Sequence, residues 1–170
     1  MGIRDTLAKA RFAMKNAAGR ELVLFVCTHN SARSQMAEGI LRQLHGDRFE
    51  AQSAGTIPTS VDPRAVTVMA EIGIDISNQR SKSVSEFYGK DIDYVVTLCD
   101  DAKQTCPFFP GGRKYIHRGV ADPVDNSKPE EDLTSFRQVR DEIRDWISRV
   151  LSRMNEDEVT EAVPFETPPV

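Results

Sequence analysis

One segment constrains the fold of this chain more than any other. Residues 21–26 form a short, almost continuously apolar run that includes Leu22, Val23, Leu24, Phe25 and Val26. A run of this kind predicts a strand of a parallel sheet that is buried on both faces. A polar loop follows, and after it apolar residues recur at helical spacing until Gly46, where we expect the helix to end.

The alternation of strand and helix patterns continues along the chain. Residues 49–54 predict a second strand, residues 93–98 a third and residues 115–117 a short fourth. Residues 63–72 predict a helix with Asp62 as its N-cap and Pro63 at its first position. Apolar residues three or four positions apart over residues 135–154 predict a long amphipathic helix. This order is typical of an α/β domain with a parallel sheet.

The chain divides into one domain and two charged ends. Its 170 residues suit a single domain, which we expect to span residues 21–154. Residues 1–20 are predominantly basic and form an N-terminal extension. Residues 155–170 are acidic and contain several prolines, which predicts a disordered tail.

Composition excludes several classes of protein. The chain is 39% hydrophobic and 28% charged, as globular proteins are. No run approaches the roughly 18 apolar residues of a membrane helix, and the N-terminus lacks the apolar stretch of a signal peptide. A net charge of −4 argues against nucleic acid as the main partner. We therefore expect a soluble, cytoplasmic protein that binds neither membranes nor nucleic acid.

The loop after the first strand carries the residues best suited to chemistry. Cys27 and Arg33 lie six positions apart, between a predicted strand and a predicted helix. Backbone N–H groups at a helix N-terminus favour negative charge. The residues between these two can therefore converge on a tetrahedral oxyanion: Thr28, His29, Asn30, Ser31 and Ala32. Arg33 can bind two oxygens of that anion through its planar guanidinium.

The same positive environment favours the thiolate form of Cys27, to which Ser34 can donate a hydrogen bond. Asn30 suits a bend in the loop because asparagine tolerates a left-handed backbone. A Cys-x5-Arg pattern also occurs by chance, and a buried, unreactive cysteine at a strand end is the ordinary alternative. The preceding strand and the helix that begins after the loop disfavour that alternative.

Two further cysteines, Cys99 and Cys106, lie downstream. Cys99 directly follows the predicted third strand, seven positions before Cys106. Because the chain has neither a Cys-x-x-Cys pair nor a nearby histidine pair, its cysteines predict no metal site. In a reducing compartment, catalytic or redox-active thiols are the main alternative to buried apolar cysteines.

These residues resemble those of a known family. Residues 27–39, CTHNSARSQMAEG, resemble the anion-binding loop of the low-molecular-weight protein tyrosine phosphatases. They are still more similar to that of the thioredoxin-coupled arsenate reductases built on the same fold. Residues 95–111, which contain Cys99 and Cys106, resemble the redox segment of these reductases. The resemblance covers about residues 21–151 and implies a four-stranded parallel sheet flanked by helices.

The resemblance also implies a reaction. Cys27 is expected to attack arsenate, and Cys99 then attacks the sulfur of Cys27 and releases arsenite. Cys106 finally forms a disulfide with Cys99, which thioredoxin reduces from outside. Asp122, followed by Pro123, matches the general acid of both families. No bound cofactor or metal is implied, and we expect a monomer.

The chain departs from the family pattern at several positions. His29 stands where both families usually have glycine, and we expect its side chain to face solvent. Ala32 replaces a second loop cysteine that many relatives have. Some reductases bind potassium through an asparagine and a glutamate, matched here by Asn30 and Glu38, and through two further residues that this chain lacks. We expect the ammonium of Lys82 to take the place of that cation, so that potassium is not needed.

Three alternatives stay open at this point. A low-molecular-weight phosphatase would use the same loop to hydrolyse phosphate esters through a phosphocysteine. It needs only one thiolate, however, and Val124 and Asp125 replace tyrosines that help phosphatases to seat aromatic substrates. A non-catalytic redox sensor would have no use for an anion-binding loop. The reductant could also be glutaredoxin or a low-molecular-weight thiol instead of thioredoxin.

Overall fold

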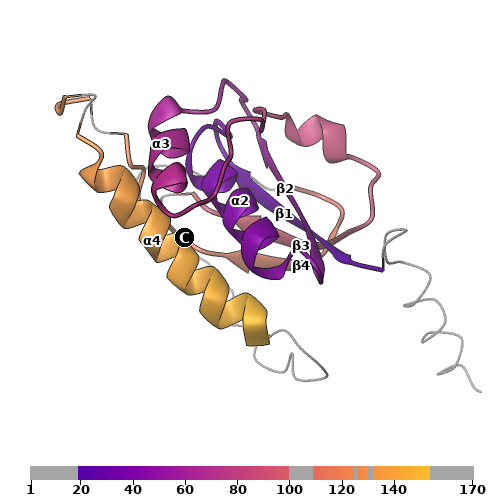
Figure 1. Cartoon of the computed structure of the whole chain (residues 1–170). Helices are drawn as coiled ribbons and strands as arrows, with labels where there is room; N and C mark the ends of the chain where they lie inside the picture. The colour runs from indigo at the N-terminus through magenta and orange to yellow at the C-terminus, as the bar shows by residue number, and fades with distance from the viewer. Residues whose placement is uncertain (1–18, 100–108, 125, 130–131, 154–170) are drawn as a thin grey trace, which may run out of the picture.

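The computed structural model describes residues 19–99, 109–124, 126–129 and 132–153. Four strands form one parallel sheet in the order β2-β1-β3-β4 (Figure 1). They are β1 (Glu21–Cys27), β2 (Phe49–Gly55), β3 (Ile92–Thr97) and β4 (Gly112–His117). The prediction of an α/β domain with a four-stranded parallel sheet flanked by helices is confirmed.

Both faces of the sheet are covered, which explains why β1 is apolar at nearly every position. On one face, Val23 and Phe25 pack into a buried cluster with α2 (Arg33–His45), α3 (Pro63–Glu71) and α4 (Thr134–Val150). On the other face, Leu24 and Val26 pack in a second cluster with Phe87 of the 3-10 turn η1 (Val84–Phe87). Successive side chains of a strand point to opposite faces, so a strand between two cores is apolar throughout.

Helix α4 lies alongside α2 and α3 on one side of the sheet (Figure 1). Its inward residues recur at the predicted spacing and are buried: Phe136, Val139, Ile143, Trp146 and Ile147. A short 3-10 turn, η2 (Leu151–Arg153), follows it. The amphipathic pattern of the sequence therefore identified the helix that closes this side of the core.

Several element boundaries differ from the predicted ones. β4 begins at Gly112, three residues before the predicted start, because Arg113 and Lys114 lie in an edge strand that leaves little apolar pattern. α3 begins as predicted, with Pro63 at its first position and the Asp62 carboxylate accepting a hydrogen bond from the Arg64 amide at 2.9 Å. The predicted end of the last helix, Met154, lies outside the described residues.

The two charged ends of the chain are the parts least represented in the structure. Most of the basic extension predicted for residues 1–20, and the whole acidic tail predicted for residues 155–170, lie outside the described residues. Among the helices that the structure does describe, none is long and apolar enough to cross a membrane.

We predict that Ile143→Ala lowers the free energy of unfolding by about 2–5 kcal/mol. Ile143 is 1% exposed in the cluster between α4 and the sheet, and its truncation would leave a cavity there. Asp145→Ala is the matched control, since this residue of the same helix is exposed, and it should change the free energy by no more than about 0.5 kcal/mol. Urea unfolding of both variants measures the difference, and equal stabilities would contradict this assignment of the core.

Candidate active site

The segment between β1 and α2 forms a compact loop at the carboxyl end of the sheet. Cys27 is the last residue of β1, and Arg33 is the first residue of α2. Asn30, between them, has a φ of 48° and is the one non-glycine residue with positive φ in the described part of the chain. The predicted left-handed position is therefore Asn30, and His29 carries no such strain.

Gly55, at the end of β2, lies directly against this loop. A Cβ atom at Gly55 would lie 2.6 Å from the carbonyl oxygen of Thr28 and 2.8 Å from the amide nitrogen of Asn30. Both are backbone atoms, which cannot move aside without moving the loop. Glycine at this position therefore lets β2 support the loop at close range.

The side chain of Cys27 receives two hydrogen bonds from the loop. The amide of Asn30 donates to its sulfur at 3.2 Å, and the hydroxyl of Ser34 lies 2.8 Å from it. Asn30 Nδ2 donates to the Ser34 oxygen at 2.8 Å, which leaves the single hydroxyl hydrogen of Ser34 for the sulfur. Two donors and the N-terminus of α2 thus converge on the sulfur of Cys27.

Asn30 is completely buried and uses its whole amide in hydrogen bonds. Its Nδ2 also donates to Ser53 of β2 at 2.9 Å. Its Oδ1 accepts from the amide of Lys82 at 2.7 Å and from Nε2 of Gln35 at 3.0 Å. Asn30 therefore ties the loop to β2, to α2 and to the segment before η1.

Gln35 and Ser53 are site residues that the sequence did not reveal. Both are completely buried polar side chains, one in α2 and one in β2. A serine at an inward position of a buried strand is a weak signal for Ser53. Gln35 offers none, because glutamine is an ordinary helix residue.

Arg33 and Asp122 are brought together from distant parts of the sequence. Arg33 is 5% exposed, and its Nη1 donates to the carbonyl oxygen of Val120 at 3.0 Å. Its Nη2 lies 3.8 Å from Oδ2 of Asp122, whose other oxygen accepts from the amide of Val124 at 3.0 Å. The predicted proton donor thus lies beside the predicted oxyanion-binding arginine.

The other loop residues contribute mainly through their backbone. The carbonyl oxygens of Thr28, His29 and Ser31 accept hydrogen bonds from residues 57, 59 and 62 respectively, so the loop is held along its length. Ala32 is buried directly before α2. The side chain of His29 is exposed, as predicted, and its Nδ1 lies 3.2 Å from the carbonyl oxygen of Ile57.

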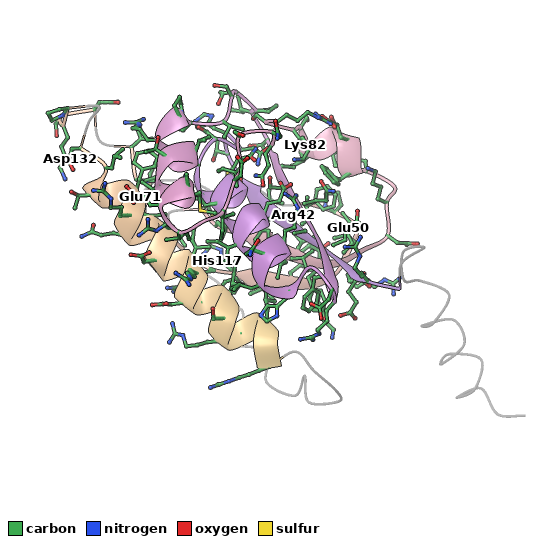
Figure 2. All side chains as sticks on the ribbon, in the orientation of Figure 1. Arg42, Glu50, Glu71, Lys82, His117 and Asp132 are labelled. Carbon is green, nitrogen blue, oxygen red and sulfur yellow. The ribbon has the colours of Figure 1, made fainter. Side chains whose placement is uncertain are left out.

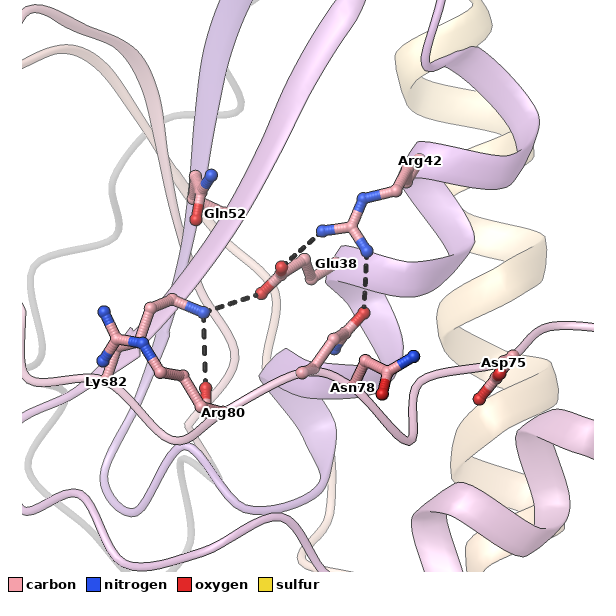
Figure 3. A pocket seen from close by; sticks show the side chains of 8 residues that line it. Glu38, Arg42, Gln52, Asp75, Asn78, Arg80 and Lys82 are labelled. Carbon is pink, nitrogen blue, oxygen red and sulfur yellow. Dashed lines mark hydrogen bonds and ion pairs between the residues drawn. The ribbon is translucent and has the colours of Figure 1, made fainter.

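A buried ion pair joins Glu38 of α2 to Lys82 (Figure 3), and the amide of Lys82 also donates to Asn30 of the loop. Glu38 of α2 is 3% exposed, and one of its oxygens lies 3.3 Å from Nζ of Lys82 and accepts a hydrogen bond from Ser53. Its other oxygen pairs with Arg42 at 2.5 Å. An ammonium and a guanidinium thus neutralise the buried carboxylate.

These contacts bear on the potassium site of some relatives. Glu38 and the Oδ1 of Asn30 are both satisfied by donors of the protein itself, so the residues present do not fit a potassium ion. Among the described residues, no cluster of histidine, cysteine, aspartate or glutamate could hold a metal. A cavity of about 530 Å³ opens beside Glu38 and Lys82, but neither Cys27 nor Arg33 lines it, so it is separate from the loop site.

Cys99 lies near Cys27 because their strands are neighbours. β1 and β3 pair in parallel, and the amide of Leu98 donates to the carbonyl oxygen of Val26 at 2.9 Å. Cys27 and Cys99 therefore leave the sheet at the same edge, and both are buried. Cys99 is disulfide-bonded, whereas Cys27 is a free thiol, so the two are not bonded to each other. Cys106 lies outside the described residues.

Comparison with known proteins adds to this geometry. The family model of the low molecular weight phosphotyrosine protein phosphatases matches residues 22–160. The chain belongs to this family. An arsenate reductase of Bacillus subtilis is 45% identical over 124 residues, which are 72% of this chain and 89% of that protein.

Two solved structures are also similar to this chain. One is an arsenate reductase in the phosphate binding state, with 32% identity and a TM-score of 0.67 over 78% of this chain and 97% of that one. The other is a thioredoxin-dependent arsenate reductase of Corynebacterium glutamicum, with 27% identity and a TM-score of 0.56 over 88% of this chain and 74% of that one.

We predict that Gly55→Ala weakens oxyanion binding in the loop by about 10–100-fold. The new Cβ would displace the backbone at Thr28 and Asn30 and so misalign bonds to a charged group, each of which contributes about 1.5–3 kcal/mol. The measurement is protection of Cys27 from alkylation by inorganic phosphate. Gly89→Ala is the control for a glycine replacement outside the loop, because a Cβ at Gly89 meets no atom within 4 Å, although its φ of 76° strains an alanine there. Equal protection in both variants would contradict the close approach.

Proposed function

We propose that this protein reduces arsenate to arsenite. The observation that carries the proposal is that a free Cys27, the last residue of β1, and a disulfide-bonded Cys99, just after β3, lie at the ends of two neighbouring strands. A phosphatase needs the first thiol and has no use for the second. Relatives that are 40–45% identical over most of their length are arsenate reductases, which supports the same activity here.

In the first step, the Cys27 thiolate attacks arsenic in arsenate bound by the loop. The amides of the loop and the guanidinium of Arg33 bind the remaining oxygens, and their positive character stabilises the charge that develops. Asp122, 3.8 Å from Arg33 and about one-third exposed, donates a proton to the oxygen that leaves as water. The product is a covalent adduct between Cys27 and arsenic.

In the second step, Cys99 attacks the sulfur of Cys27. A disulfide forms between them, and the bond between Cys27 and arsenic breaks. Its electron pair stays on arsenic, which is thereby reduced by two electrons and leaves as arsenite. The neighbouring positions of the two cysteines at one edge of the sheet support this step.

In the third step, Cys106 attacks Cys99 and frees Cys27, and thioredoxin then reduces the Cys99–Cys106 disulfide. A free Cys27 beside a disulfide-bonded Cys99 is the state expected at the end of this cascade. The thioredoxin-dependent reductase of Corynebacterium glutamicum supports the choice of thioredoxin. We propose that the enzyme acts in the cytoplasm as a monomer without a bound cofactor.

Hydrolysis of phosphate esters is a second activity that the same site supports. Phosphate and arsenate share shape and charge, and Cys27, Arg33 and Asp122 form the set that a phosphocysteine mechanism needs. The exposed Val124 offers no aromatic ring to seat phosphotyrosine. We therefore expect a weak activity on small phosphate esters beside the reductase activity.

Cys106→Ser tests the three-thiol scheme. We predict one equivalent of arsenite per enzyme and no further turnover with thioredoxin, because the Cys27–Cys99 disulfide can no longer be transferred. Hydrolysis of a small phosphate ester should be unchanged, since it uses Cys27 alone, and Cys27→Ser should abolish both reactions. Arsenite release is measured with thioredoxin, glutaredoxin, a low-molecular-weight thiol or no reductant. Sustained turnover of Cys106→Ser would overturn the scheme.

We predict that replacing sodium by potassium changes kcat/KM for arsenate by less than about twofold, because Lys82 already supplies the positive charge beside Glu38. In Lys82→Met the buried carboxylate loses this partner, so potassium should raise the melting temperature of the variant but not that of the wild type. Thermal unfolding in each salt provides the measurement. A large potassium activation of the wild-type enzyme would show that Lys82 does not replace the cation.

A further inference from the structure

The carboxyl end of β4 lies beside that of β3, the strand that leads into Cys99. His117 is the last residue of β4 and is labelled in Figure 2. Its Nδ1 lies 3.9 Å from the sulfur of Cys99 and 2.8 Å from the hydroxyl oxygen of Thr97. The ring is exposed, whereas Cys99 is completely buried. A titratable side chain therefore lies between a buried sulfur and solvent.

The sheet register accounts for this placement. Thr97 and His117 are directly paired in the parallel β3–β4 ladder, and the amide of Arg118 donates to the carbonyl oxygen of Thr97 at 2.8 Å. Paired residues on neighbouring strands present their side chains on the same face, which brings Thr97 and His117 together, and Cys99 lies just beyond the end of β3. His117 and Cys99 thus meet without any bend in β4.

We infer that His117 is the proton acceptor for Cys99, an inference that rests on the proposed reduction of arsenate. Cys99 must be a thiolate to attack the sulfur of Cys27, and a thiol at neutral pH is mostly protonated. As the attack occurs, the thiol proton of Cys99 passes to Nδ1 of His117, and a bond forms between the sulfurs of Cys99 and Cys27. The electron pair of the Cys27–arsenic bond stays on arsenic. The imidazolium then releases its proton to solvent.

Thr97 fits this role because a hydroxyl can both donate and accept a hydrogen bond. The single lone pair of Nδ1 takes the thiol proton when the ring is neutral, and the protonated Nδ1 can then donate to the Thr97 hydroxyl oxygen, 2.8 Å away, which holds the ring in place. The charged side chains that flank His117 on and after β4 have partners of their own: Arg113 with Asp91 and Asp93, Lys114 over the ring of Tyr94, and Arg118 with Glu142. Cys99 and Thr97 both lie within hydrogen-bonding reach of the His117 Nδ1.

The proton acceptor is tested in the Cys106→Ser background, where a single turnover stops at the Cys27–Cys99 disulfide. We expect His117→Ala to slow formation of this disulfide and release of arsenite by about 10²–10⁴-fold, the usual contribution of a general base. The rate of Cys27 alkylation should stay unchanged, because His117 ends β4, which β3 separates from β1 and Cys27. His45→Ala is the matched control, since His45 ends α2 and lies outside the site.

A second measurement separates proton transfer from a structural role. With Cys27 and Cys106 both replaced by serine, the thiolate absorbance of Cys99 reports its titration directly. We expect His117→Ala and the more conservative His117→Asn to shift this titration to higher pH, and Thr97→Val to shift it by a smaller amount. A wild-type protein that releases no arsenite would refute the proposed function. Normal single turnover and an unshifted Cys99 titration in the His117 variants would refute the role of His117 alone.

Discussion

The site depends first on the backbone of Asn30. Its left-handed conformation turns the loop so that its own amide points at the sulfur of Cys27. A left-handed asparagine costs free energy, and the conformation persists because every hydrogen-bonding group of its buried amide has a partner. The same amide leaves the Ser34 hydrogen free to bond Cys27, so one residue determines both the shape of the loop and the direction of its hydrogen bonds.

The parallel sheet is the second constraint, because it brings the ends of successive strands to one edge. β1 ends in Cys27, β3 leads into Cys99 and β4 ends in His117, and these three strands are neighbours in the order β1-β3-β4. Cys27, Cys99 and His117 therefore lie at or just beyond the ends of three adjacent strands although they are far apart in the sequence. The fold supplies proximity, and the side chains at the strand ends decide the chemistry.

The same loop can serve both hydrolysis of phosphate esters and reduction of arsenate. Binding a tetrahedral oxyanion and presenting a thiolate to its central atom need only the loop, Arg33 and a proton donor, and a phosphatase and a reductase share these parts. We propose that the sulfur of Cys99, at the neighbouring strand end, distinguishes the reductase. It can form a disulfide with Cys27 as the bond between Cys27 and arsenic breaks. The buried Glu38, on α2 next to the loop, forms ion pairs with Lys82 and Arg42.

By itself, the sequence predicted the α/β class, the succession of strands and helices along the chain, and the loop from Cys27 to Ser34, because apolar periodicity and the local pattern around Cys27 are properties of neighbouring residues. It placed the start of β4 too late, because an exposed edge strand has little apolar pattern. Only the tertiary structure decided which distant side chains meet: Gln35 and Ser53 at Asn30, Asp122 at Arg33, and His117 at Cys99. The physical reason is that strand pairing and helix packing bring these residues together, and no local sequence pattern links residues so far apart in the chain.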